Sequence, residues 1–275
     1  MNLAVGFFDG VHAGHQLLLE RADAVLTFTN HPATVFAPER APLLLMTAED
    51  RLAALAADGR RRVVARDFTP VLAAQMPSDF AVSLRRDFPD LDTVFCGANW
   101  TFGAGGAGTP AFLRERGFRV EEVPFASWRG ERVSSTRIRA ALGNGDVAAA
   151  AEMLGRPYSV VGDVVRGKGL GRELGFPTIN VRPALGNLPL GRGVYAVATP
   201  LGRGLANWGV APTMGDRAWA EPVLEVHLLA DPSGPPPETM RVSFASFIRP
   251  ERAFASVGDL RAQLARDCAD ARARC

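Results

Sequence analysis

Two histidines lie three residues apart in a glycine-rich segment that follows a short apolar run. His12 and His15 belong to the stretch GFFDGVHAGH, where an expected strand ends and an expected helix begins. Glycines let the backbone turn tightly and approach a ligand, and a helix N-terminus offers unpaired N–H groups to an anion. Imidazoles at this spacing can face one phosphate group and donate hydrogen bonds as charge develops on it. We therefore predict a phosphate site here; structural histidines or metal ligands are the alternatives.

A second set of phosphate-binding residue types lies at positions 134–139, with the sequence SSTRIR. Its hydroxyl groups stand at the start of an expected helix. Arg137 and Arg139 supply planar, permanently charged donors that suit a triphosphate. Asn99 and Trp100 come just past the end of an expected strand, where open parallel sheets bind their ligands. The alternatives are a helix cap with solvated arginines and a packed loop.

A glycine-rich loop in the second half of the chain carries three basic residues in the sequence RGKGLGR, residues 166–172. The spacing is not that of a Walker A motif, but the backbone amides of such a loop still cradle phosphates. Thr178 and Asn180 follow on an expected strand, two residues apart, so their side chains point the same way. A hydroxyl and an amide carbonyl are hard oxygen ligands suited to Mg²⁺. The pattern predicts a second phosphate site, with magnesium.

The elements that must position these residues change in kind along the chain. Short apolar strands alternate with amphipathic helices in the first half, which indicates βαβ units and a mostly parallel sheet. From residue 159 to 247, short strands separated by Gly/Pro turns indicate a closed barrel or a sandwich, and residues 257–273 return to helical spacing. We expect two domains, residues 1–154 and 155–275. The expected first-half strands are 3–6, 25–29, 62–65, 93–96 and 118–123, and the helices are 15–21, 47–57, 78–86 and 109–116.

Composition limits the classes of protein that this chain can be. It has 275 residues, 47% hydrophobic and 22% charged, which is ordinary for a globular protein of one large or two modest domains. The net charge of +2 gives no broad surface for nucleic acid or an anionic membrane. Three cysteines are too few and too scattered for a disulfide framework. We expect a cytoplasmic protein without a signal peptide or membrane span; the oligomeric state stays open.

The segment GFFDGVHAGHQ resembles the HxGH signature of the nucleotidyltransferase superfamily. In this longer form it is similar to the FMN adenylyltransferase domain of the bifunctional bacterial riboflavin kinase/FAD synthetases. The segments TFTNHP at 27–32, GANWTFG at 97–103 and SSTRIR at 134–139 are similar to further motifs of that family. The second half resembles riboflavin kinase in GKGLGRELGFPTIN at 167–180, NWGVAPTMG at 207–215 and LEVH at 224–227. The resemblance covers nearly the whole chain.

This resemblance implies an α/β plus β fold. A doubly wound, Rossmann-like nucleotidyltransferase domain would be followed by a six-stranded antiparallel riboflavin-kinase barrel with a C-terminal helix. The barrel would use MgATP to phosphorylate riboflavin to FMN, and the N-terminal domain would adenylylate FMN to FAD with release of pyrophosphate. The cofactor is Mg²⁺, and the partners are the small molecules ATP, riboflavin, FMN and FAD, with no nucleic acid and no membrane.

The resemblance also assigns roles to residues. Glu225 is the carboxylate placed to accept the riboflavin hydroxyl proton, with His227 supporting it. His31 is expected to shape its loop or contact the flavin phosphate rather than act as a base. The implied catalytic residues are His12, His15 and Glu225; the ATP-binding residues are Gly6, Phe7, Asp9, Gly10, Gly14, Ser135, Thr136, Arg137, Arg139, Gly167, Lys168, Gly169, Gly171 and Arg172; the flavin-binding residues are His31, Asn99, Trp100 and Asn207; and the metal ligands are Thr178 and Asn180.

Two departures from the family pattern affect the first domain. Thr101 stands where the family usually has an arginine, and the stretch between the first helix and the second strand is short. They leave open a riboflavin kinase with weak or lost adenylyltransferase activity. A catalytically inactive flavin-binding regulatory protein is a further alternative, against which intact His12, His15, Thr178, Asn180 and Glu225 argue.

Overall fold

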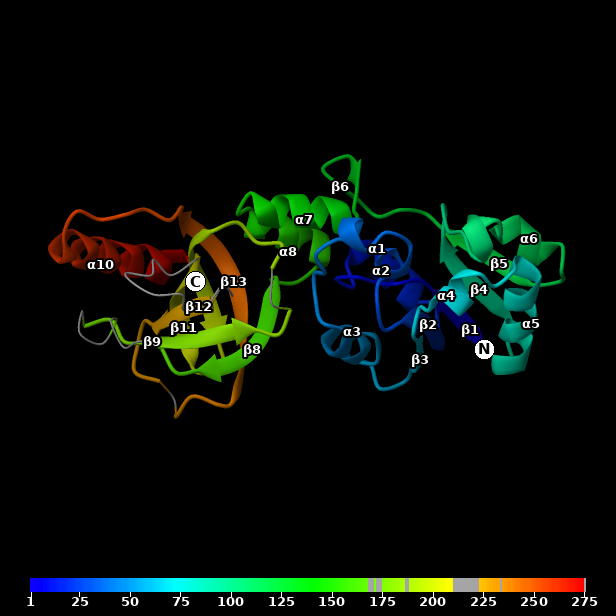
Figure 1. Ribbon diagram of the computed structural model, residues 1–275, viewed down its shortest axis with the longest axis horizontal. Helices are drawn as coiled ribbons and strands as arrows, with labels where there is room; N and C mark the ends of the chain where they lie inside the picture. The colour runs from blue at the N-terminus through cyan, green and yellow to red at the C-terminus, as the bar shows by residue number, and fades with distance from the viewer. Residues whose placement is uncertain (168–170, 172–174, 186–187, 210–222, 233, 275) are drawn as a thin grey trace. The chain divides into compact units, whose positions relative to one another are not determined.

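A computed structural model describes the chain except residues 168–170, 172–174, 186–187, 210–222, 233 and 275 (Figure 1). The chain divides into two compact units. The first contains Met1–Pro42 and Met46–Ser135, and the second contains Leu43–Leu45 and Thr136–Cys275. Each unit is described by itself.

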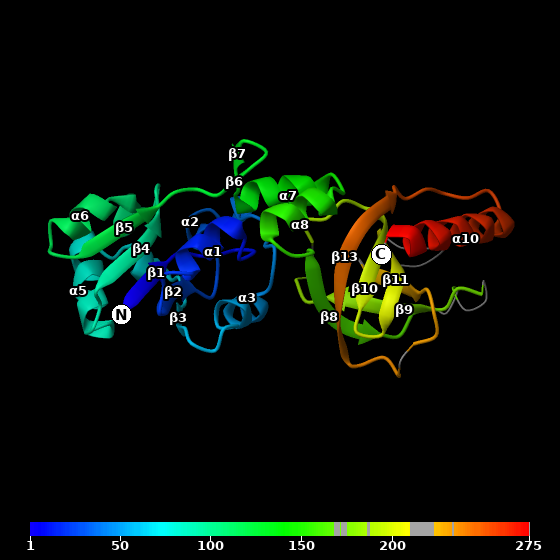
Figure 2. The ribbon, with the colours of Figure 1, turned by 180° about the vertical axis from the view of Figure 1, so that it is seen from behind.

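A five-stranded parallel sheet forms the centre of the first unit, in the order β3-β2-β1-β4-β5 (Figures 1 and 2). The strand order reverses beside β1, because β2 lies on one side of it and β4 on the other. In open α/β sheets, such a switch point is where ligands bind, beyond the carboxyl ends of the strands. The strands are β1 (Asn2–Val5), β2 (Ala24–Phe28), β3 (Arg62–Arg66), β4 (Thr93–Gly97) and β5 (Arg119–Val123).

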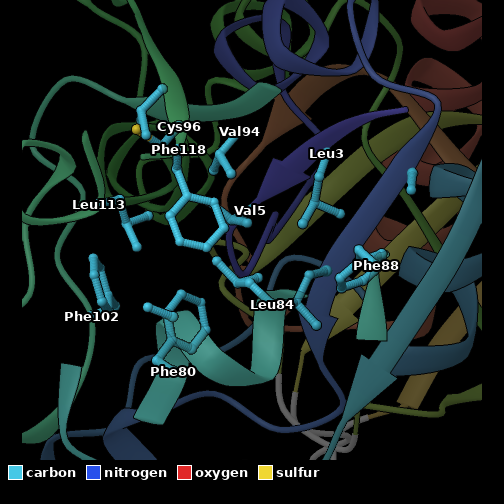
Figure 3. Packing of buried hydrophobic residues seen from close by; sticks show 14 residues of the cluster. Leu3, Val5, Phe80, Leu84, Phe88, Val94, Cys96, Phe102, Leu113 and Phe118 are labelled. Atoms are coloured by element: carbon cyan, nitrogen blue, oxygen red, sulfur yellow. The ribbon is translucent and has the colours of Figure 1, made fainter. Parts of the chain in front are cut away.

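Helices cover both faces of this sheet because its strands are apolar on both sides. Leu3 and Val5 of β1 pack in one cluster with Phe80 and Leu84 of α5 (Figure 3). Ala4, between them on the strand, packs in the other cluster with residues of α1 and α3, as the period of two in a strand requires. The predicted doubly wound fold is confirmed.

The helices of the first unit are short, and two of them fill connections for which no element was predicted. α2 and α4 have four residues each, too few to show a helical period. The helices are α1 (Ala13–Leu19), α2 (Ala33–Phe36), α3 (Ala48–Leu55), α4 (Pro70–Ala73), α5 (Pro77–Asp87) and α6 (Pro110–Arg114), with 3₁₀ turns η1 (Pro38–Arg40) and η2 (Ala104–Gly106) and a hairpin of β6 (Ser127–Trp128) and β7 (Glu131–Arg132).

The second unit contains a closed barrel in the order β10-β11-β12-β9-β8-β13. All of its described strand pairs are antiparallel, and the C-terminal helix α10 packs Cys268 and Ala271 against apolar residues of β10 and β11. The predicted six-stranded antiparallel barrel with a C-terminal helix is confirmed. Its elements are α7 (Ser135–Gly143, beginning at the last residue of the first unit), α8 (Val147–Leu154), β8 (Ser159–Val165), β9 (Thr178–Pro183), β10 (Gly193–Thr199), β11 (Gly202–Gly209), β12 (Val223–Leu228), β13 (Thr239–Arg249) and α10 (Val257–Arg274).

Among the residues that the structure describes, no helix is long and apolar enough to cross a lipid bilayer.

Candidate active sites

The loop between β1 and α1 has a strained backbone that its own side chains hold in place. Phe8 and Val11 have φ angles of 60° and 42°, and Gly10 has 81°. A positive φ costs a non-glycine residue on the order of 1–3 kcal/mol, so it persists only where the surroundings enforce it. Phe8 and Val11 are both buried in the core cluster beneath the sheet. Their burial fixes the loop in this shape without help from a ligand.

His12 and His15 lie in stacked contact at the start of α1. His12 is the N-cap residue, and its Nδ1 accepts the backbone N–H of His15 at 3.3 Å. The ring centroids are 3.6 Å apart. Because Nδ1 of a neutral His12 acts as an acceptor, its ring proton is on Nε2, where it makes that atom a donor. The structure thus brings the two imidazoles together; that they face one phosphate group stays a prediction.

His15 is held in its neutral form by its surroundings. Burial, and then the nearby His12, lower the pKa of His15 well below its ordinary value of 6.5. Its Nδ1 atom is buried and has no hydrogen-bond partner. Buried polar atoms are usually satisfied, and those that are not often belong to functional sites. A neutral imidazole with one unsatisfied ring nitrogen fits a site whose ligand supplies the missing partner.

Two predicted ATP-binding residues, Gly14 and Ser135, contact the loop between β1 and α1. A β-carbon added at Gly14 would lie 3.2 Å from Cε1 of His12, closer than ordinary van der Waals contact, so only glycine leaves this imidazole its full space. The hydroxyl of Ser135 donates a hydrogen bond to the carbonyl of Asp9 at 3.0 Å. Thr136, Arg137 and Arg139 follow on α7, where Nε of Arg139 donates to the carbonyl of Leu43 at 2.5 Å.

The flavin-binding candidates of the first unit follow the ends of β2 and β4. Nδ1 of His31 accepts the N–H of Ala33 at 3.1 Å, so this side chain does shape its loop. The indole of Trp100 stacks on Phe102 with ring centroids 4.8 Å apart and packs against the core, whereas Asn99 is exposed. Because β2, β1 and β4 are adjacent and parallel, these residues and the histidine pair share the carboxyl edge of the sheet.

Three polar residues form a row across adjacent strands of the barrel. Asn207 of β11 pairs with Glu225 of β12, which pairs in turn with Asn180 of β9. Thr178 pairs in the same way with His227. Directly paired residues of antiparallel strands have their side chains on the same face. The structure thus brings the predicted base, the two predicted metal ligands and Asn207 to one face.

Two described glycines of the glycine-rich loop, Gly167 and Gly171, lie close to the two predicted metal ligands. A β-carbon added at Gly167 would overlap the side-chain amide of Asn180. One added at Gly171 would overlap the carbonyl of Phe176 and lie 3.2 Å from Oγ1 of Thr178. Only a residue without a side chain allows this approach at Gly167. Lys168, Gly169 and Arg172, also predicted to bind ATP, lie outside the described residues.

Glu225 has an environment that keeps its carboxylate basic. Burial, followed by the negative charge of Glu251, raises the pKa of Glu225 above its ordinary value. Asn207 connects these groups, because its Nδ2 donates to Oε1 of Glu251 at 3.4 Å. A ring nitrogen of His227, Nδ1, lies 2.9 Å from the carbonyl of Pro177, the residue before Thr178. Glu251 was not predicted, because it follows the last strand without a spacing that relates it to Glu225.

Comparisons with known proteins identify the family of this chain. Residues 1–137 match the family model described as FAD synthetase, and residues 154–275 match the one described as riboflavin kinase. The chain is 34% identical to the bifunctional riboflavin kinase/FMN adenylyltransferase of Haemophilus influenzae, over 98% of this chain and 93% of the relative. The chain belongs to this family.

Further relatives extend the match within the family. The bifunctional enzymes of Escherichia coli K12 and Bacillus subtilis are 35% and 30% identical to this chain, each over 96% of it and over 90% and 89% of their own lengths. A crystal structure described as a macrolide-efflux protein from Streptococcus pneumoniae has a TM-score of 0.85 and 27% identity, and the match covers 98% of this chain and 93% of that one. The match shows that the two proteins share a fold. The efflux role in its name is a statement about the Streptococcus pneumoniae protein and not about this chain.

The predicted family, fold class and enzyme class are confirmed by these matches. The chain carries both a riboflavin kinase domain and an FAD synthetase domain, and it matches its bifunctional relatives over nearly its full length. The main prediction, a bifunctional enzyme of flavin cofactor biosynthesis, is therefore confirmed at the level of the family.

Proposed function

We propose that residues 1–154 transfer an adenylyl group from ATP to FMN, and that residues 155–275 phosphorylate riboflavin with ATP. The observation that carries this proposal is the presence of two separate polar constellations, each within a unit that matches the corresponding catalytic domain. One is the stacked histidine pair at a helix N-terminus, and the other is the row Asn207–Glu225–Asn180 on the barrel.

In the first reaction, the role of His12 and His15 is to donate hydrogen bonds to the phosphate oxygens of ATP. An oxygen of the FMN phosphate attacks the α-phosphorus, and the bond from that phosphorus to the bridging oxygen breaks. Pyrophosphate leaves with the electron pair, and no enzyme nucleophile is needed. The donor at Nε2 of His12 and the fixed loop meet the developing charge without having to rearrange, which is how such groups lower a barrier.

The remaining residues of this site bind the substrates. Following the family resemblance, we assign ATP binding to the loop after β1 and to the segment SSTRIR, whose two arginines suit a triphosphate. His31, Asn99 and Trp100 would contact the flavin. The ATP-binding set is Gly6, Phe7, Asp9, Gly10, Gly14, Ser135, Thr136, Arg137 and Arg139.

In the second reaction, Glu225 accepts the proton of the riboflavin 5′-hydroxyl while that oxygen attacks the γ-phosphorus of ATP. The γ-phosphorus to bridging-oxygen bond breaks, and ADP leaves. A general base works best when its pKa lies near the working pH, and the environment of Glu225 shifts its pKa in that direction. Asn207, paired with Glu225, would position the flavin.

The residues present fit Mg²⁺ at the barrel site. Thr178 and Asn180 offer a hydroxyl and an amide oxygen on one face, the hard oxygen donors that Mg²⁺ prefers, and Gly167 lies directly against the Asn180 amide. When bound, the ion would neutralise charge on the ATP phosphates. We assign ATP binding here to Gly167, Lys168, Gly169, Gly171 and Arg172.

The other partners proposed are small molecules only, and the proposed compartment is the cytoplasm.

The wild-type protein tests this proposal directly. Purified enzyme is incubated with riboflavin and MgATP, and the flavins are separated by chromatography. We expect FMN to appear first and FAD to follow. FMN accumulating without FAD would support a riboflavin kinase that has lost its adenylyltransferase activity. Thr101, which stands where the family usually has an arginine, is the reason to consider this outcome. No conversion of riboflavin or of added FMN would support an inactive flavin-binding protein.

A further inference from the structure

A completely buried arginine lies beneath the predicted adenylyltransferase site. Arg51 is 0% exposed and is the largest of the fully buried side chains among the described residues. It belongs to α3, whose N-cap Thr47 starts the helix so that this position faces inward. An arginine side chain is almost never fully buried unless its charged group is paired with other groups. The position therefore needs an explanation beyond the packing of a core helix.

The guanidinium of Arg51 holds together the loops that follow β1 and β2. Its Nη2 donates to the carbonyls of Phe28 and Thr29, at 2.6 and 3.1 Å, where β2 ends. Its central carbon lies 4.0 Å from the centroid of the Phe7 ring, in the loop after β1. The Phe7 ring also contacts the His31 ring edge-on, with ring centroids 4.7 Å apart. One side chain thus contacts both loops and, through Phe7, reaches the predicted flavin ligand His31.

The cost of this arrangement argues against a purely structural role. Nε and Nη1 of Arg51 are buried and have no hydrogen-bond partner. Burial lowers the pKa of Arg51, and the negative charge of Asp9 offsets only part of that effect. An apolar residue of similar size would fill the same space without this desolvation penalty. What an apolar residue could not do is bind two carbonyls and the face of an aromatic ring at once.

We propose that Arg51 is a positioning residue for FMN in the adenylyltransferase site, acting through Phe7 and the end of β2. It is not a catalytic residue, because its complete burial keeps it from the substrates. The hydrogen bonds of Arg51 go to the end of β2, and its ring contact reaches His31 through Phe7; its charge also acts on Asp9 in the loop after β1. Its loss therefore weakens FMN binding more than the chemical step. This inference rests on the proposed adenylyl transfer in this unit.

The test compares two substitutions of Arg51 with a matched control. Arg51→Met removes the charge and the N–H donors of the guanidinium while keeping a side chain of similar length. Arg51→Lys keeps the charge but lacks the planar guanidinium that donates two hydrogen bonds and packs on a ring. Arg61 is the control: it also donates to a backbone carbonyl, that of Leu55 at 2.8 Å, and also has a buried Nε without a partner, but it pairs with Asp58. For each variant, FAD formation is measured at varied FMN and at varied ATP, with riboflavin phosphorylation as an internal check of the other unit.

We expect Arg51→Met to raise the KM for FMN about tenfold, because the β2 end loses both of its hydrogen bonds to this side chain. The KM for ATP should rise by less, since Phe7 and Asp9 lose only a ring contact and a charge interaction, and kcat should change less than about threefold. Arg51→Lys should fall between Arg51→Met and the wild type, and Arg61→Met should leave both KM values unchanged. A wild-type KM for FMN in Arg51→Met, an equal rise in Arg61→Met, or a loss confined to kcat would overturn the inference. If Arg51→Met does not fold, the same criteria apply to Arg51→Lys.

A double substitution tests the route through Phe7. Phe7→Leu alone should raise the KM for FMN, and adding it to Arg51→Met should raise that KM by less than the product of the separate effects, because coupled residues are not additive. Multiplicative effects would overturn the route. His12→Ala tests the underlying assignment separately: FAD formation that survives it removes the proposed function, whereas an unchanged KM in the Arg51 variants removes only this inference.

Discussion

Two imidazoles stacked with centroids 3.6 Å apart cannot both carry a proton without strong repulsion. The stacking and the burial of His15 act in the same direction, and both favour the neutral ring. In the proposed reaction, a neutral His15 would give the phosphate oxygens a hydrogen-bond donor that stays neutral at every pH above the ordinary pKa of histidine.

The stability of the folded protein should fall in mild acid because of His15. Its folded-state pKa is below the value of 6.5 expected when unfolded, so the unfolded chain binds the proton first as the pH falls. The stabilisation is therefore complete above pH 6.5 and is lost below it, by at most about 1.4 kcal/mol per pH unit. We expect His15→Gln to reduce the loss of unfolding free energy between pH 7.5 and 5.5, measured by urea denaturation. Equal losses in the two proteins would contradict the burial of a neutral His15.

At the scale of elements, Gly167 of the glycine-rich loop contacts Asn180 of β9, the proposed metal ligand of the kinase reaction. Gly167→Ala places a methyl group against the Asn180 amide, so either the backbone at Gly167 or the Asn180 side chain must move. We expect riboflavin phosphorylation to fall about tenfold or more, since small displacements in a positioned site are costly. FAD formation from added FMN should be unaffected.

Gly234→Ala is the matched control for this substitution. Gly234 lies in the same unit, and a β-carbon there meets no heavy atom within 4 Å. It should leave both activities at the wild-type level. Full kinase activity in Gly167→Ala would show that the loop does not need its close approach to Asn180.

The docking of α10 on the barrel depends on a buried ion pair. Arg249, at the end of β13, contacts Asp267 of α10 with both Nε and Nη2, and the Asp267 side chain is 1% exposed. Removing one member of such a pair leaves the other uncompensated, at a cost of about 3 kcal/mol. Asp267→Ala should lower the free energy of unfolding by this amount in a denaturant titration, whereas Asp270→Ala, at an exposed position of the same helix, should not. Similar values for the two variants would contradict the role of the pair.

The sequence predicted long, periodic elements better than short ones. α3 was expected at 47–57; the helix is Ala48–Leu55, and its N-cap Thr47 accepts the N–H of Asp50. The two-residue strands β6 and β7 were not predicted, because two residues have no period. His12 was not expected as the N-cap of α1, because histidine is not among the preferred N-cap residues.

The candidate sites show a similar limit. The period of two placed Thr178 and Asn180 on one face, but the pairing of Asn180 with Glu225 depends on register between strands far apart in sequence. Arg51 was not predicted because a buried arginine has no sequence signature that separates it from an exposed one. Glu251 was not predicted because only the fold brings it to Asn207.

At the scale of the whole molecule, the near-neutral charge and the anionic substrates are compatible because basic residues are concentrated locally. Arg137 and Arg139 follow Ser135 at the start of α7, and Arg166, Lys168 and Arg172 belong to the glycine-rich loop. A net charge of +2 is thus the sum of local cationic sites and a balanced remainder. Each unit has its own core, and the two proposed catalytic sets, the histidine pair and the row around Glu225, lie in different units, so each reaction should survive damage to the catalytic residues of the other.

The separation of the two activities by single substitutions tests this account most directly. His12→Ala and Glu225→Ala are each given riboflavin with MgATP, and separately FMN with MgATP, and the flavin products are separated by chromatography. His12→Ala should still form FMN but lose FAD formation by about 100-fold or more. Glu225→Ala should lose riboflavin phosphorylation by about 100-fold and still convert added FMN to FAD. Loss of both activities in either folded variant, or of neither, would contradict two independent sites built on these residues.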